Sequence, residues 1–139
     1  MPNKMTQEQI DVFLSEPNVS MLATVRPDGS PHVTPVWHHY DRGLIYVCSD
    51  AQSVKIQNIR HESRVSLLVA TVKAPHQYVM TNGVAELSSD RISDLVWAMS
   101  LAYKGEKEGR IYAEKAIKEF DFVTITIRPT KMVSLYIGA

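Results

Sequence analysis

Two turn sequences in the first third of the chain constrain its fold more than any other feature. Residues 26–30 (RPDGS) place proline and glycine as a tight turn requires, between apolar, β-branched segments at 19–25 and 31–40. Residues 41–43 (DRG) give a second turn signal before another apolar segment at 44–48. Two turns at this spacing predict three antiparallel strands in a meander.

Local patterns predict the remaining helices and strands. Thr6 and Gln9 have the spacing of a capping box, which predicts a short helix that ends before Pro17. The other expected helices are one at 51–60, one that is capped by residues 88–90 and reaches Tyr103, and one that follows a charged loop at 104–110 and reaches Phe120. The other expected strands lie at 64–72, 77–87, 122–127 and 132–137.

Two short segments interrupt these later strands. Too few residues precede Asn82-Gly83 for a full hairpin arm, so a β-bulge is favoured over a turn there. Residues 128–131 (RPTK) contain proline between two apolar segments, and they are expected to turn the chain into a final hairpin.

Strands that arrive in hairpins favour an antiparallel sheet over a parallel, doubly wound one. The sequence also lacks the glycine-rich phosphate loops of α/β proteins. Six or seven short strands, with helices between them, therefore predict a mainly β, α+β fold built as a small antiparallel barrel with flanking helices. The 139 residues are enough for one core, and no repeat or linker divides them, so one domain over 1–139 is expected.

Composition disfavours several classes of protein. Lys+Arg and Asp+Glu both number 15, so no overall positive charge is present to hold a nucleic acid. The longest apolar stretches, such as 65–72, are too short to span a membrane. The polar N-terminus differs from a secretory signal, and the one cysteine, Cys48, leaves no partner for an internal disulfide. We therefore expect a cytoplasmic protein.

The strongest chemical signal is the segment 48–55, where a predicted strand leads into a predicted helix. The first turn of a helix presents unpaired N–H groups and a partial positive charge, and Ser49, Ser53 and Lys55 add hydroxyls and a cation beside it. This pattern fits an anion site, with phosphate as the first candidate ligand. The alternative is that Ser49 or Asp50 only caps the helix while Lys55 lies in solvent.

Other chemistry has weaker support. His32 and His38 are expected on one strand face, yet six residues place them about 20 Å apart, so no shared metal ion is expected. No local pattern gives Cys48 a base for nucleophilic catalysis. Trp37 fits either a core or interface aromatic residue or a segment whose backbone lies along a planar ligand.

Taken in order and spacing, several segments resemble the pyridoxamine 5'-phosphate oxidase-like split-barrel superfamily, in its short branch that binds FMN or the deazaflavin coenzyme F-420. The segments that carry the resemblance are Met21–Thr24, Arg26–His32, Pro35–Trp37, Ser53–Ile59 and Arg64–Leu68. The resemblance covers nearly the whole chain. It implies a six-stranded antiparallel split β-barrel of the FMN-binding type, assembled as a homodimer with cofactor sites at the interface.

The resemblance also implies which residues bind the cofactor. Ser53 and Lys55 match the region that holds the cofactor phosphate, as the helix start at this position also suggests. The cofactor ring is expected to lie along the strand segment Thr34–Trp37. Gln77 and Tyr78 correspond to the next strand that borders the pocket. The full set of expected cofactor-binding residues is Thr34, Pro35, Val36, Trp37, Ser49, Ser53, Lys55, Asn58, Gln77 and Tyr78.

One departure from the family narrows the expected activity. The Arg-x-Val-Leu-Leu-Lys strand of true pyridoxamine phosphate oxidases is absent, and residues 32–37 (HVTPVW) stand in its place. This argues against vitamin B6 oxidation and for an oxidoreductase that transfers hydride between F-420, slightly preferred, or FMN and a small organic acceptor. The alternatives are a non-catalytic cofactor- or tetrapyrrole-binding protein and an interaction module without a cofactor. No catalytic residue is assigned, and Tyr78 and His38 are the candidates for proton delivery.

Overall fold

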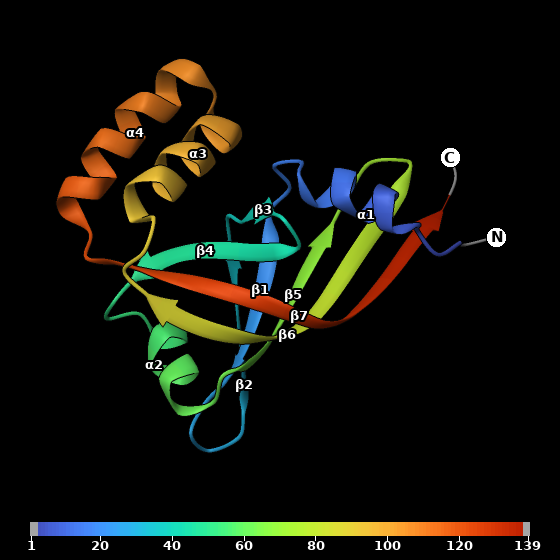
Figure 1. Cartoon of the computed structure of the whole chain (residues 1–139), viewed down its shortest axis with the longest axis horizontal. Helices are drawn as coiled ribbons and strands as arrows, with labels where there is room; N and C mark the ends of the chain where they lie inside the picture. Colours follow the sequence, from blue (N-terminus) through green and yellow to red (C-terminus); the bar gives the residue numbers. More distant parts are fainter. Residues whose placement is uncertain (1–2, 138–139) are drawn as a thin grey trace.

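The computed structural model describes residues 3–137, which form four helices and a seven-stranded antiparallel sheet (Figure 1). The helices are α1 (Gln7–Leu14), α2 (Val54–His61), α3 (Ile92–Lys104) and α4 (Glu106–Glu119). The strands are β1 (Ser20–Val25), β2 (Pro31–Val36), β3 (His39–Asp41), β4 (Leu44–Asp50), β5 (Arg64–Ala70), β6 (His76–Ser88) and β7 (Phe122–Ile137). Their order in the sheet is β2-β1-β5-β6-β7-β4-β3.

The first helix begins as predicted. The Thr6 hydroxyl accepts a hydrogen bond from the Gln9 backbone N–H at 3.1 Å, and the Gln9 side chain accepts one from the Thr6 N–H at 2.8 Å. This capping box satisfies two N–H groups that the helix cannot pair internally. The helix then buries Phe13 and Leu14, which joins α1 to the main core.

The predicted meander is wrong, because segment 31–40 divides into two strands at opposite edges of the sheet. β2 pairs only with β1, while β3 pairs only with β4. The chain leaves the sheet at Trp37 and His38, and the His38 side chain is buried there rather than continuing a strand pattern. Pro31 and Pro35 fit an edge strand, since proline has no N–H to donate to a second neighbour. This division is also why the sheet has seven strands rather than six.

The predicted bulge is confirmed, whereas the predicted C-terminal hairpin is wrong. β7 runs without a turn through residues 128–131 and pairs with β6 along its length. The register shifts between Asn82 and Gly83, where Gly83 lies opposite Pro129. A Cβ atom at Gly83 would lie 2.7 Å from the Arg128 carbonyl oxygen, so only glycine allows the two strands to approach here. Proline is accommodated in the strand because the bulge disrupts the regular ladder.

The boundaries of the later helices also differ from the predictions. Residues 51–53 form a turn, and α2 begins after Ser53. Arg91, with a positive φ of 57°, precedes α3 without a side-chain cap, so residues 88–90 do not cap this helix. The expected loop at 104–110 is a single residue, Gly105, whose φ of 87° lets the chain reverse at once into α4. The α3–α4 hairpin lies at one end of the molecule (Figure 1).

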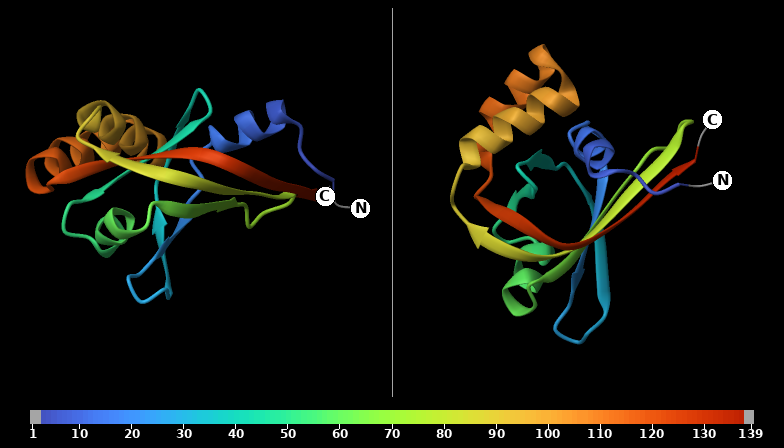
Figure 2. Two further views of the ribbon diagram at one scale, coloured as in Figure 1. Left: turned by 60° about the horizontal axis from the view of Figure 1, so that its bottom comes forward. Right: turned by 45° about the vertical axis from the view of Figure 1, so that its right-hand side comes forward.

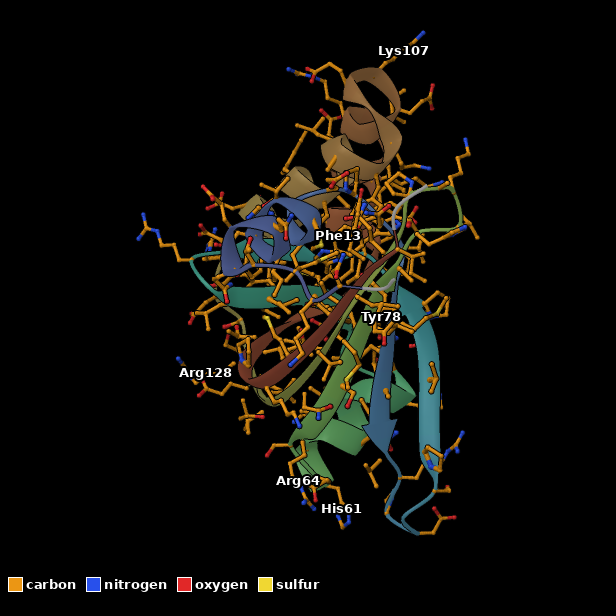
Figure 3. The ribbon with its side chains drawn as sticks, turned by 90° about the vertical axis from the view of Figure 1, so that its right-hand side faces the viewer. Phe13, His61, Arg64, Tyr78, Lys107 and Arg128 are labelled. Carbon is orange, nitrogen blue, oxygen red and sulfur yellow. The ribbon has the colours of Figure 1, made fainter. Side chains whose placement is uncertain are left out.

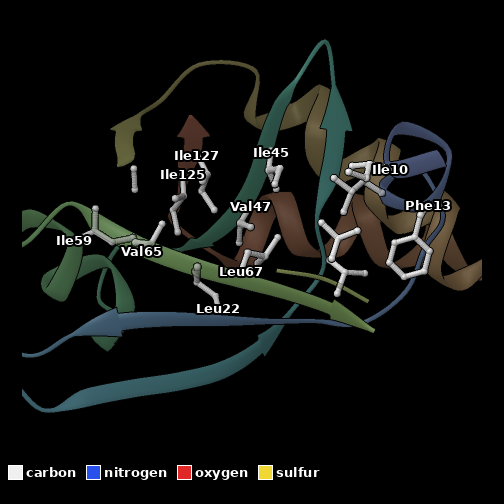
Figure 4. Close-up of a cluster of buried hydrophobic side chains, with 14 of the residues drawn as sticks. Ile10, Phe13, Leu22, Ile45, Val47, Ile59, Val65, Leu67, Ile125 and Ile127 are labelled. Carbon is white, nitrogen blue, oxygen red and sulfur yellow. The ribbon is translucent and has the colours of Figure 1, made fainter. Parts of the chain in front are cut away.

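The strands curl around the main hydrophobic core (Figure 2), and Figure 4 shows part of it. Its fully buried side chains include Leu22, Ile45, Leu67, Ile125 and Ile127, which come from one face of the sheet. A second, smaller cluster lies on the opposite face of β4. It joins the α3–α4 hairpin to the sheet through Val96, Ala113, Ala116 and the neighbouring side chains of Cys48, Tyr112 and Phe122. This second cluster is the setting of the candidate site.

A line of apolar residues, four of them exposed and one half-buried, crosses five neighbouring strands on the outer face of the sheet. The pairing register places Pro35, Met21, Leu68, Met80 and Val133 opposite one another in this order. Met21 is 42% exposed, and Leu68 and Val133 are each 37% exposed. We call these five residues the apolar row.

None of the helices within residues 3–137 has the length and apolar character needed to span a bilayer.

Candidate functional site

A cavity of about 400 Å³ lies where the α3–α4 hairpin meets the sheet. Five segments besides the hairpin contribute to its wall: the residue before β1, the end of β2 with the residue after it, the outer face of β4, the start of α2 and the start of β7. Its apolar lining comes from Val19, Pro35, Val36, Trp37, Val96, Met99, Tyr112 and Phe122. Cys48, Lys55 and Ser100 complete the wall. A mostly apolar cavity with few polar groups is typical of small-molecule sites.

One part of the wall carries a cation and two hydroxyls. The Lys55 ammonium donates a hydrogen bond to the Ser49 hydroxyl at 3.2 Å, and the Ser49 and Ser53 hydroxyl oxygens lie 2.9 Å apart. Ser53 is the N-cap residue of α2, yet its side chain makes no capping hydrogen bond. These three groups therefore converge beside the start of α2, where anions are favoured.

Lys55 is half-buried and has no counter-ion among residues 3–137. None of the ion pairs formed by residues 3–137 includes it. Burial lowers the pKa of its ammonium group, because the partly apolar surroundings disfavour the charge. A bound anion would restore the stability of the charged form. Because Lys55 is half-buried, the alternative in which it lies freely in solvent is wrong. The Asp50 carboxylate accepts a hydrogen bond from the Gln52 backbone N–H, so Asp50 caps a turn rather than helix α2.

Trp37 lines the cavity and lies between strands rather than on one. Its ring stacks on Tyr103, with centroids 5.0 Å apart and planes inclined by 8°. Tyr112 meets the Trp37 ring edge-on at 5.4 Å. Both geometries are favourable for aromatic pairs. The Trp37 indole is thus held by aromatic neighbours while it contributes to the cavity.

A buried hydrogen-bond network around His38 holds the Tyr103 ring, on which Trp37 stacks. The His38 Nε2–H donates to the Leu14 carbonyl at 2.7 Å, so its Nδ1 accepts from the Ser20 hydroxyl. The Tyr103 hydroxyl donates to the Asn18 carbonyl at 2.8 Å and accepts from the His38 backbone N–H at 3.2 Å. Burial lowers the pKa of His38, which favours this neutral form. His38 is therefore a positioning residue whose ring nitrogens are both occupied, rather than a free proton donor.

The cavity brings together only part of the residue set expected from the sequence. Pro35, Val36, Trp37 and Lys55 line it, and Ser49 and Ser53 adjoin Lys55. Asn58 is buried elsewhere, where its amide donates to the Thr24 hydroxyl at 3.0 Å and attaches α2 to β1. Thr34 lies on β2 and does not line the cavity. Its buried hydroxyl has no hydrogen-bond partner within the described residues.

Gln77 and Tyr78 lie on β6, outside this cavity. Gln77 lines a separate hollow formed with residues 70–75, the end of β5 and the β5–β6 connection. Tyr78 lies opposite Ala70 and Leu135 on the face that carries the apolar row. Figure 3 shows Tyr78 among the strands, far from Lys107 at the tip of the helical hairpin. Within one chain these two residues do not join the Lys55 site.

Sequence reasoning missed several residues of the site. Met99, Ser100, Tyr112 and Phe122 line the cavity, but their spacing fits ordinary helix or strand packing, so no local signal marks them. Cys48 also lines the cavity, and burial raises the pKa of its thiol to about 11. Within residues 3–137, no group of three or more His, Cys, Asp or Glu side chains is arranged to hold a metal ion.

An antiparallel sheet that curls around its core and is flanked by four helices defines a small protein of the α+β class, with a half-buried cation in the wall of a mostly apolar cavity. Residues 6–134 match the family model described as pyridoxamine 5'-phosphate oxidase. The chain belongs to this family, within its split-barrel superfamily.

Solved structures agree with this assignment. A conserved hypothetical protein from Mycobacterium tuberculosis is 25% identical, with a TM-score of 0.80, and the match covers 95% of this chain and 85% of that one. An F-420 reductase is 25% identical, with a TM-score of 0.71, over 88% of this chain and 94% of that one. A FAD-binding protein from Mesorhizobium loti is 19% identical, with a TM-score of 0.71, over 98% and 96% of the two chains, and this likeness concerns the fold alone.

Proposed function

We propose that this protein binds a phosphate-bearing deazaflavin or flavin and transfers hydride between it and a small organic acceptor. The observation that carries the proposal is the half-buried Lys55 ammonium, which has no counter-ion in the described chain and lies beside two hydroxyls in the cavity wall. A phosphate group would accept hydrogen bonds from all three groups and would supply the missing negative charge.

The rest of the cavity fits the ring of such a cofactor. Its walls are mainly apolar, and Pro35, Val36 and Trp37 provide a rigid, flat boundary because the Trp37 indole is stacked on Tyr103. The cofactor would supply the hydride chemistry itself. The protein would hold the phosphate through Lys55, orient the ring against the segment 35–37 and exclude water with its apolar lining.

Coenzyme F-420 is the first candidate cofactor and FMN the second. The F-420 reductase match covers most of both chains. The segment 32–37 (HVTPVW) also lacks the basic residues of true pyridoxamine phosphate oxidases, which argues against vitamin B6 oxidation. FMN remains a candidate because the Lys55 site would recognise a phosphate on either molecule.

We further propose that the protein forms a homodimer through the apolar row. These five residues form an apolar line across five strands, with Met80 half-buried and the other four exposed, and exposed apolar surface of this kind often marks a binding face. Tyr78 lies on the same face, and Gln77 lines the hollow beside it. In such a dimer, these two residues would approach the partner's cavity rather than their own.

The proposal is tested by titrating the purified, cofactor-free protein with F-420 and with FMN while following cofactor fluorescence. Tight binding of one of them, followed by its oxidation when acceptors are added to the reduced form, is the expected result. Binding without turnover by any acceptor would support the non-catalytic alternative. Binding of neither cofactor would reject the proposed function.

A further inference from the structure

A second hollow, of about 680 Å³, adjoins the candidate cavity, and the proposed function assigns no ligand to it. It is formed by the segment that leads into β1, the end of β5, the connection between β5 and β6, and the start of β6. Most of its lining residues are apolar. Val19 lines both this hollow and the cavity, so the two are neighbours along one wall.

The second hollow gathers apolar side chains that the chain leaves in contact with solvent. Val72 in its wall is 93% exposed, and Val19 is 51% exposed. Met21 and Leu68, two exposed members of the apolar row, lie opposite each other in neighbouring strands and also line it. Exposed apolar side chains that collect in one concave place mark a binding site, because a ligand removes them from water.

Hydrogen bonds hold both sides of the second hollow in place. In the β5–β6 connection, the Thr71 hydroxyl donates to the Pro75 carbonyl at 3.2 Å and accepts from the Gln77 N–H at 3.1 Å. The Thr71 N–H donates to the Gln77 carbonyl at 3.0 Å. On the other side, the Asn18 carbonyl accepts from the Tyr103 hydroxyl at 2.8 Å. The hollow therefore has the fixed walls that a binding site requires.

The charge of the second hollow indicates the class of ligand. Lys73 is the one charged residue among its lining residues within 3–137, and no aspartate or glutamate of that part of the chain lines it. Lys73 also forms no ion pair in the described chain. An apolar surface with a single cation complements an apolar molecule that carries a single negative charge.

We propose that the second hollow binds an apolar organic anion, whose negative group pairs with Lys73 and whose apolar body covers Met21 and Val72. This site is distinct from the anion site at Lys55, which lies at the start of α2. Because the hollow and the cavity share Val19, the anion would lie beside the occupant of the cavity. Only the identity of that neighbour as a cofactor rests on the proposed function.

The test of charge recognition uses two fluorescent probes, anilinonaphthalenesulfonate, which is an apolar anion, and N-phenylnaphthylamine, which is the same ring system without the sulfonate. Dissociation constants are measured on the wild type, Lys73→Met and Lys107→Met, whose exposed lysine on α4 makes it the matched control. Loss of an exposed ion pair should weaken binding of the sulfonate about twofold to fivefold in Lys73→Met. Binding of the neutral probe should not change, and Lys107→Met should affect neither probe.

Val72→Ser tests the apolar part of the site. Removal of its methyl groups from the contact should weaken both probes about threefold to tenfold. Val12→Ser, which changes an exposed valine of α1 outside the hollow, is the matched control and should affect neither. All four replaced side chains are exposed, so the variants should keep the melting temperature of the wild type within a few degrees.

Each outcome decides the inference. Equal effects of Lys73→Met on the two probes, or no effect on either, overturn it. Loss of sulfonate binding in Lys55→Met but not in Lys73→Met places the probe in the neighbouring cavity and also overturns it. Probe binding that increases on dilution, as dimers separate, shows that a second copy occupies the hollow instead.

The inference and the proposed function fail separately. Sulfonate binding that depends on Lys73 supports the second site even when neither FMN nor F-420 binds. Conversely, binding of a cofactor without any Lys73-dependent binding of the sulfonate overturns the second site while the proposed function stands.

Discussion

Replacement of Lys55 by methionine separates recognition of the phosphate from recognition of the ring. Methionine keeps an unbranched apolar side chain in the cavity wall but removes the ammonium group. A hydrogen bond between charged groups contributes about 1.5–3 kcal/mol. Lys55 is half-buried and also donates to Ser49 at 3.2 Å, so the lower part of this range applies. A loss of about 2 kcal/mol corresponds to roughly thirtyfold weaker binding.

The assay is a thermodynamic cycle. Dissociation constants for FMN and for riboflavin, which has the same ring but no phosphate, are measured on the wild type and on Lys55→Met. We expect a roughly thirtyfold loss for FMN and no loss for riboflavin. If F-420 is the bound cofactor, the same cycle uses its phosphate-free deazaflavin. Lys107→Met is the matched control, because Lys107 is an exposed lysine at the start of α4 (Figure 3).

Two results would refute this reasoning. Equal losses for FMN and riboflavin would mean that Lys55 shapes the cavity or contacts the ring instead of binding the phosphate. An equal effect of Lys107→Met would mean that any positive charge on this side of the molecule attracts the ligand.

Four further predictions concern stability and assembly. Gly109→Ala should lower the free energy of unfolding by about 1–2 kcal/mol in a urea titration, because the clash with α3 outweighs the better helix propensity of alanine. Tyr103→Phe keeps the ring but loses the hydrogen bonds to residues 18 and 38, so stability should fall by about 1–2 kcal/mol and the tryptophan fluorescence, to which Trp37 contributes, should change. Met21→Glu in the apolar row should shift sedimentation from dimer to monomer. Burial raises the pKa of Cys48 to about 11, and burial with a hydrogen bond to a carboxylate raises the pKa of Tyr40 to about 12. Both groups stabilise the folded state while they are protonated, so the free energy of unfolding should be at its full value below pH 9 and should fall as the pH rises from 9 to 12. In Tyr40→Phe, the part of this fall at the highest pH should be absent.

Val12→Glu changes an exposed apolar residue of α1 outside the apolar row, so it should leave sedimentation unchanged. A dimer that survives Met21→Glu would show that another surface joins the copies. Unchanged urea stability in Gly109→Ala would show that the helices separate easily at this contact. Alkaline unfolding curves that coincide for Tyr40→Phe and the wild type would contradict the assigned role of the Tyr40 hydroxyl.

Features set by neighbouring residues were predictable from the sequence. The Thr6–Gln9 capping box depends on groups within a few residues, and the Asn82-Gly83 pair is a local signal of the bulge although the opposing strand is distant in sequence; both were predicted. The apolar spacing of α3 likewise gave the body of that helix. Part of the site was also accessible in this way, because Ser49, Ser53 and Lys55 lie close together along the chain and meet in space.

Features set by distant contacts were not predictable. Segment 31–40 has a suitable pattern for one strand, and its division depends on burial of His38 against Leu14 and Ser20. The aromatic wall joins Trp37 to Tyr103, which lies 66 positions further along the chain. Nothing near either residue signals that pairing. The local sequence of residues 128–131 (RPTK) predicts a turn, but the segment is extended because β6 pairs beside it.

Pro35 belongs both to the apolar row and to the cavity wall. A second copy that covers the apolar row would therefore also touch the rim of the ligand site. Thermodynamic linkage then requires that any gain in ligand affinity on association be matched by an equal gain in association on ligand binding. Where association raises ligand affinity, the apparent affinity would rise with protein concentration, and saturating ligand would slow the exchange of subunits between dimers. In that case the protein would release its ligand in dilute solution as the dimers separate.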